Sequence, residues 1–251
     1  MENVKNSFLI KVTKINELQE AINLYKKEAK SNIGYLNNPI FQRMRDGKDD
    51  NLVKRFFTSP FAHVRIWLPQ MFGLFLQRFY DHPYAYVVVD NLSDEYGKYA
   101  GAKELEPTHA DLYRHLLDIL KIPIKSETMS TPDTKPSKAA NNFYKWFKEQ
   151  VETKSVYYLL SHFLAYEITD VLDFSDYTTA IKRIYPDESE MHEFFTQHAN
   201  SGHDESFGRD LQTVYNKHKK EMDEALANLL QHWYIFYEQS FDEIKPVISN
   251  V

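Results

Sequence analysis

Apolar residues recur at steps of three or four along most of this chain, which is the spacing of helices with one buried face. In the last part of the chain, Leu211, Tyr215, His218 and Met222 follow this spacing. The stretches 61–80 and 155–172 are apolar nearly all round, as expected for buried helices, and Pro69 should kink the first. The helical stretches predicted in this way are 15–30, 39–47, 50–57, 61–80, 83–95, 107–120, 137–153, 155–172, 174–185, 188–198 and 204–244.

Turn-forming residues separate these stretches. Gly47 closes one helix, and Ser59–Pro60 restarts the chain before the next. The stretch 96–106 has no apolar period and reads as a loop, whereas 126–137, with two prolines, is the best exposed loop. Because the helical pattern resumes directly after it with no shift in composition, we expect residues 1–251 to form one domain.

Composition supports a helical protein. The 251 residues include only 7 Gly but 17 Tyr and 17 Phe, and such a balance favours helices over a loop-rich β fold. A chain of this length can bury a substantial core. We therefore predict an all-α fold, a single helical bundle of about seven or eight helices.

Charge and residue usage exclude several classes of partner and site. The net charge is −6 with no long basic run, so nucleic acid is not an expected partner. The chain has no cysteine, which excludes disulfides, thiolate metal sites and a cysteine nucleophile, and fits a reducing, cytoplasmic compartment. No signal region and no run of about 18 apolar residues is present, so no membrane association is expected.

Carboxylates and histidines in several predicted helices supply the candidate chemistry. Glu95 ends an apolar helix, and His109 lies in the first turn after Pro107 and Thr108. Taken alone, each reads as a surface or capping residue. Glu167 interrupts a strongly apolar helix and needs a partner there. A metal ion and an Arg, Lys or Tyr hydroxyl are equal candidates for that partner.

His198 and His203 lie in the densest group of potential ligands, although a polar turn around residues 201–202 explains that group equally well. Together, the four segments supply Glu, His, Glu and His. This is the ligand inventory of a non-heme di-iron or di-manganese site inside a helical fold. The predicted ligands are Glu95, His109, Glu167 and His198, with His203 as a fifth and Asp204 and Glu205 as its alternates.

With these residues in place, the chain resembles the heme-oxygenase-like di-metal oxidases and oxygenases, the iron-containing redox enzymes. The stretches 91–97 and 109–113 look like the first Glu and first His of that family. The stretch 165–167 looks like its second Glu, and 193–198 like the start of its last ligand helix. The resemblance spans about residues 39–236 and implies a heme-oxygenase-like fold.

One departure from the family concerns its last motif. The family usually continues from this His with an Asp and then a second His, where this chain has Gly202 and Glu205. Three alternatives follow: the last helix turns His203 or Asp204 inward, Glu205 replaces the His, or the second metal site is weak. The resemblance implies iron, with two ions and manganese as an option.

The implied reaction is dioxygen activation to oxidise a small amino-acid-like or fatty-acid-like substrate. Dioxygen and that substrate are the expected partners, and a homodimer is compatible with the sequence. The rival hypothesis is a metal-free helical binding protein, or a cofactor-independent enzyme, of similar shape.

Overall fold

The computed structural model describes residues 3–96, 108–200 and 203–245, with 3, 94–96, 203, 204 and 206 given by backbone alone. Apart from an isolated bridge between Ile124 and Pro132, the regular structure of these residues is helical. The all-α prediction is confirmed, with slightly more helices than the seven or eight expected. None of the helices in the described part is long and apolar enough to cross a membrane.

The helical elements follow one another in a simple order. They are α1 (Asn3–Val12), α2 (Leu18–Ala29), η1 (Tyr35–Asn37), α3 (Pro39–Asp46), α4 (Asp50–Phe56), η2 (Phe57–Phe61), α5 (Ala62–Val64), α6 (Trp67–Phe79), α7 (Ala85–Tyr96), α8 (His109–Ile119), α9 (Lys138–Thr153), α10 (Val156–Ile184), α11 (Ser189–Ala199) and α12 (His203–Ile244).

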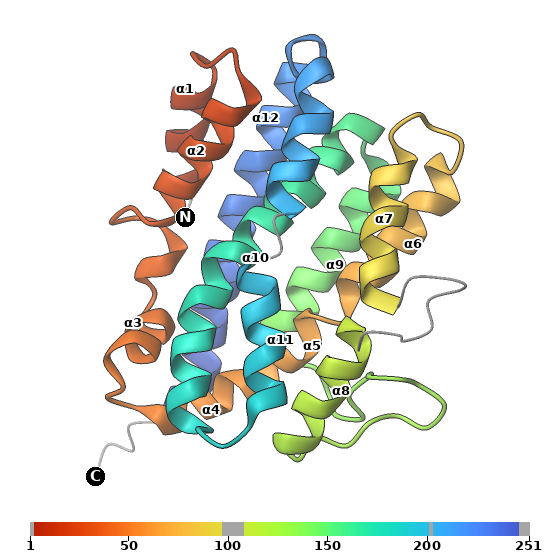
Figure 1. Ribbon diagram of the computed structural model, residues 1–251. Helices are drawn as coiled ribbons and strands as arrows, with labels where there is room; N and C mark the ends of the chain where they lie inside the picture. Colours follow the sequence, from red (N-terminus) through yellow and green to blue (C-terminus); the bar gives the residue numbers. More distant parts are fainter. Residues whose placement is uncertain (1–2, 97–107, 201–202, 246–251) are drawn as a thin grey trace.

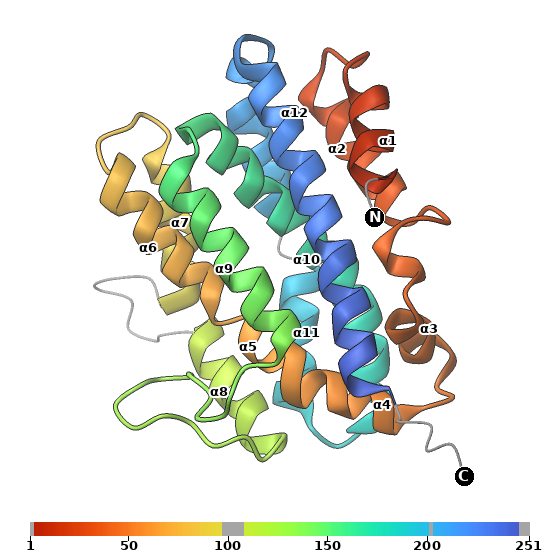
Figure 2. The same cartoon turned by 180° about the vertical axis from the view of Figure 1, so that it is seen from behind.

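Helix α10 runs through the middle of the molecule (Figure 1). It packs against α11 and α12, while α8 packs on α11, and α1, α2 and α9 pack against α12. Figure 2 shows α9 and α12 side by side on the opposite face, with α6 beyond α9. The central position of α10 explains why most of its residues are buried, charged ones included.

Two predicted boundaries are wrong around the longest helices. The stretches 155–172 and 174–185 form one helix, α10, because Asp173 and Phe174 are both buried inside it and neither breaks it. The predicted last helix is instead two segments that meet at His218, whose φ of −114° and ψ of 15° are not helical. Figures 1 and 2 show the chain turning back there, so the two parts of α12 lie side by side.

The predicted helix 61–80 is also interrupted, but not at Pro69. A π-helical turn, η2, contains Pro60 and continues α4 without a restart, and the break follows at residues 65–66. The ring of a proline clashes with the carbonyl four residues earlier, which here belongs to Arg65. Pro69 therefore lies in the first turn of a new helix, α6, where proline is tolerated.

Helix ends follow the expected capping chemistry. Gly47 closes α3 with a φ of 68°, in the left-handed region that glycine adopts without strain, as predicted. Asp49, rather than the predicted Asp50, caps α4 by accepting a hydrogen bond from Leu52 N. The loop at 126–137 carries no helix and is mostly exposed, whereas the predicted loop at 96–106 lies almost wholly outside the described residues.

Aromatic rings form the centre of the core near α10 and α11. Phe61 contacts Tyr177 at a centroid distance of 5.3 Å and Phe195 at 5.7 Å, and all three rings are buried. Burying one such ring contributes about 1.5–3 kcal/mol. The same cluster supports the part of α11 that carries His198.

Candidate functional site

The start of α8 places His109. Thr108 is the N-cap of this helix: its Oγ1 accepts from Asp111 N at 3.1 Å, and Asp111 Oδ2 accepts from Thr108 N at 3.2 Å. This reciprocal capping box satisfies donors that the first turn would otherwise leave unpaired. It fixes the point at which α8 begins, and His109 is the first residue of the helix.

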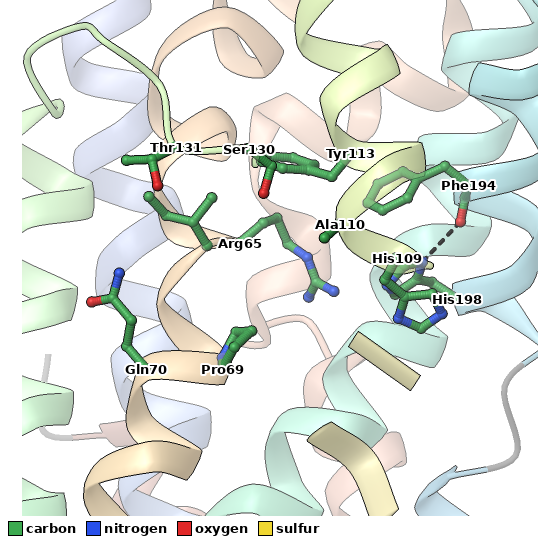
Figure 3. Close-up of a pocket in the computed structure, with 11 residues that line it drawn as sticks. Arg65, Pro69, Gln70, His109, Ala110, Tyr113, Ser130, Thr131, Phe194 and His198 are labelled. Atoms are coloured by element: carbon green, nitrogen blue, oxygen red, sulfur yellow. Dashed lines mark hydrogen bonds between the residues drawn. The ribbon is translucent and has the colours of Figure 1, made fainter. Parts of the chain in front are cut away.

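The end of α11 places His198 in a buried aromatic slot. Its ring stacks on Phe174 at a centroid distance of 4.6 Å and an angle of 16°, with Phe194 on another side at 4.5 Å. Nδ1 donates to the carbonyl oxygen of Phe194 at 2.8 Å, drawn as the dashed line in Figure 3. In a neutral imidazole this bond assigns the proton to Nδ1 and leaves the lone pair on Nε2, as in histidines that bind metals.

The structure brings His109 and His198 together. Their ring centroids are 4.2 Å apart, with an angle of 36° between the rings. Both line a cavity of about 80 Å³, shown in Figure 3, which α8, α11, the α5–α6 break and the loop at Ser130–Thr131 enclose. His109 also borders a second, more open pocket along the outer face of α11. The histidine pair is therefore close to solvent on one side and shielded on the other.

An arginine faces the same cavity. Arg65 Nη1 donates to Asp170 Oδ2 at 2.5 Å, and both side chains are buried. Its guanidinium lies 4.8 Å from the centroid of Phe174, the ring that stacks on His198. Nearby, the Tyr113 hydroxyl donates to the Ala62 carbonyl at 2.5 Å, and burial raises the pKa of that phenol while Arg65 lowers it.

Glu167 is buried on α10, with 5% of its surface exposed. Asp170 and Phe174 follow it by three and seven residues, so all three share one face of the helix. That face contacts Arg65 through Asp170 and His198 through Phe174. Glu167 therefore lies on the same face of α10 as the residues that contact Arg65 and His198.

The other predicted ligands are placed only in part. Glu95 lies in the last turn of α7 and His203 begins α12, but these side chains, and that of Asp204, lie outside the described part of the structure. Glu205 is described, and it is exposed. Among the side chains that are described, no three His, Asp or Glu form a group that could hold a metal ion.

Sequence reasoning missed Arg65 and Asp170. The signal was present, because each is a charged residue inside a strongly apolar helix, the same argument that identified Glu167. What the pattern could not supply is their pairing across the fold.

The donors that the structure assembles fit iron in type. Imidazole and carboxylate are ligands that non-heme iron accepts, and the hydrogen bond to Phe194 orients the His198 ring. The buried Glu167 adds a carboxyl group on the face of α10 that contacts Arg65 and His198 through its neighbours. The described residues thus bring two imidazoles together, with a buried carboxyl group on the neighbouring helix α10.

Comparison with known proteins agrees with this chemistry. The family model described as "iron-containing redox enzyme" matches residues 54–235. No curated protein matches the chain. A crystal structure of a CADD-like protein of unknown function from Nostoc punctiforme has a similar fold, with a TM-score of 0.71 and 13% identity over 91% of this chain and 99% of that one. The match to the family model covers most of the chain, which therefore belongs to the family of iron-containing redox enzymes.

Proposed function

We propose that the chain is a non-heme iron oxidase or oxygenase that oxidises a small amino-acid-like or fatty-acid-like substrate with dioxygen. The observation that carries this proposal is the pair of imidazoles, whose ring centroids are 4.2 Å apart at the edge of a cavity, with buried carboxyl groups on the neighbouring helix α10. Iron bound there would supply the activation of dioxygen, which no side chain can perform alone.

The proposed ligands are Glu95, His109, Glu167 and His198, for a site of two ions with iron preferred and manganese as the alternative. His203 or Asp204 would complete the second ion's coordination. The exposed side chain of Glu205 makes it the weaker choice.

Arg65 suits the proposed substrates. Amino acids and fatty acids both carry a carboxylate, and a guanidinium binds that group with well-defined geometry. Arg65 faces the cavity, and Asp170 already holds it in place through one nitrogen. The cavity of about 80 Å³ is far smaller than the roughly 300–1,000 Å³ of typical ligand sites. Substrate entry would therefore require movement of the wall at Ser130–Thr131 or of α8.

The test is anaerobic loading of the purified protein with ferrous iron, followed by metal analysis and by the optical spectrum on exposure to air. Glu167→Ala should clearly lower the bound iron. Asp176→Ala is the matched control, since it removes a carboxylate from the same helix, where that carboxylate pairs with Arg45. Equal iron in Glu167→Ala and the unsubstituted protein would exclude Glu167 as a ligand, and no iron in either would favour a metal-free helical protein.

The substrate class is tested separately. Oxygen consumption by the iron-loaded protein is measured with panels of amino acids and fatty acids. Arg65→Lys keeps the charge but loses the planar donor pair, so it should raise the substrate concentration needed for half-maximal rate. An unchanged concentration dependence would show that Arg65 does not bind the substrate.

A further inference from the structure

A second buried polar cluster lies on α10, beyond Phe174. The Tyr237 hydroxyl donates to Asp173 Oδ2, and the hydroxyls of Tyr177 and Tyr237 are 2.5 Å apart. All three side chains are buried. A third buried phenol, Tyr35, stacks on the ring of Tyr237 at a centroid distance of 5.4 Å and interacts with this carboxylate, which lowers the pKa of Asp173. The cluster therefore gathers three phenols around one buried carboxylate.

Ring contacts connect this cluster to the histidine pair. The His198 ring stacks on Phe174, and Phe174 lies 5.2 Å from Tyr177 between centroids. The hydroxyl of Tyr177 then meets that of Tyr237. A single phenylalanine ring thus separates the imidazole from the first phenol, and Phe174 follows Asp173 directly in the sequence.

The geometry of the cluster fits proton transfer, because the Tyr237 O–H already points at Asp173 Oδ2 and the ionised carboxylate can take that proton. Burial raises the pKa of Asp173 well above its usual range, although the hydrogen bond from Tyr237 acts in the opposite direction. Such a carboxylate, when ionised, is a stronger base than one in water. Burial and the nearby Asp173 charge raise the pKa of both Tyr177 and Tyr237, so the phenols keep their protons at rest.

A phenol that loses one electron becomes a very strong acid, so its oxidation is easiest where a base can take the proton. We propose that Tyr237 is a redox-active residue that gives an electron through Tyr177 and Phe174 to an oxidant beside His198, and a proton to Asp173. The electron reduces that one-electron oxidant, and the O–H proton moves to Oδ2. The products are a neutral phenoxyl radical and a carboxylic acid, with no other bond changed.

Only the identity of the natural oxidant rests on the proposed function, since an iron site that reacts with dioxygen would supply it. The transfer itself belongs to the protein and can be driven without iron. A purely structural role for the cluster predicts no such transfer, although it accounts for the same hydrogen bonds.

The absence of cysteine permits a clean test on metal-free protein. Glu193→Cys, on the exposed side of α11, gives a single attachment point for a ruthenium polypyridyl photo-oxidant. A light flash with an electron-accepting quencher then produces the one-electron oxidant about one helical turn from His198. Electron paramagnetic resonance and transient absorption detect tyrosyl radicals, and circular dichroism checks the fold of every variant.

The labelled protein should give a tyrosyl signal that is lost in Tyr237→Phe and retained in Tyr234→Phe, the matched control one turn earlier on α12. Asp173→Asn, which removes the base but keeps the shape, should slow radical formation and abolish its dependence on deuterated water. A signal that persists unchanged in folded Tyr237→Phe would overturn the proposal. Should that variant not fold, equal rates in Asp173→Asn and the parent protein would overturn it instead.

Discussion

The imidazoles of His109 and His198 lie against each other at a centroid distance of 4.2 Å and an angle of 36°, although they come from helices that are far apart in the sequence. Each ring is held by contacts of its own, which do not involve the other ring. A capping box fixes the first, and a backbone carbonyl with two phenylalanine rings fixes the second. Two imidazoles positioned independently in this way would form a preorganised part of the proposed metal site.

The first prediction concerns this pair. His109→Ala and His198→Ala should each weaken ferrous iron binding by at least about tenfold, because each removes a nitrogen ligand. His115→Ala, on the more exposed side of α8 beside Glu190, is the control and should bind iron normally. Anaerobic equilibrium dialysis gives the affinities. Unchanged binding in both single variants would exclude the pair as ligands.

The second prediction concerns the cap that holds His109. Thr108→Ala should lower the free energy of unfolding by about 0.5–2 kcal/mol and should also weaken iron binding, because the start of α8 frays. Ser137→Ala removes a comparable cap from α9, where Ser137 Oγ accepts from Ala140 N at 3.0 Å. That control should lose similar stability with no effect on iron. Urea unfolding and dialysis measure the two quantities, and equal iron binding in both variants would contradict the positioning role.

The third prediction concerns the buried ion pair of Arg65 and Asp170. Asp170→Leu leaves a buried guanidinium without this partner and should cost about 3–5 kcal/mol of unfolding free energy. Arg65→Met together with Asp170→Leu should recover much of that loss, since two apolar side chains replace two charges. Glu152→Ala breaks an exposed pair with Lys148 and should cost at most about 1 kcal/mol. Strict additivity of the two core substitutions in urea unfolding would show that the pair is not coupled.

The fourth prediction concerns pH and His162. This ring is fully buried, both of its nitrogens lack hydrogen-bond partners among the described residues, and burial lowers its pKa to about 3. The unfolded chain has the ordinary pKa of about 6.5 and so binds a proton between these values, where the folded protein does not. Stability should therefore fall as the pH drops from about 6.5 toward 3, by about 1.4 kcal/mol per pH unit.

His162→Leu removes this contribution. The free energy of unfolding of the parent protein, relative to that of the variant, should decline steadily between pH 6 and pH 4 in urea titrations. Parallel pH profiles for the two proteins would show that His162 is not held neutral by burial.

The sequence predicted local features of the fold well where the chemistry is local. Thr108 begins a helix and Gly47 ends one through hydrogen bonds within a few residues, so both roles can be predicted without knowledge of the tertiary structure. The turn at His218 cannot be predicted in this way, because neither Gly nor Pro marks it and the apolar spacing continues across it. The chain turns there through tertiary packing, with α1 lying along one part of α12 and α2 along the other.

The candidate site shows the same difference between local features, which the sequence predicts, and tertiary contacts, which it does not. Glu167 was identifiable because a carboxylate in an apolar helix needs a partner, but the contact of Arg65 with Asp170 joins distant segments and could not be read from spacing. The meeting of His109 with His198 was expected because both belong to the predicted set of metal ligands, although their spacing in the sequence does not show it. The assignment of the iron ligands stays a prediction, since the side chains of Glu95 and His203 lie outside the described part of the structure.

Because α10 is uninterrupted, its helical geometry fixes the angles between its side chains around the helix axis. This single helix carries Glu167, Asp170, Asp173 and Phe174, and helical geometry alone sets the directions of their side chains relative to each other. One residue inserted before Glu167 would turn all four by roughly 100° relative to the neighbouring helices. The chain can therefore change length in the loop at 126–137, but not along this helix, without taking the buried carboxyl groups and the tyrosine cluster out of alignment together.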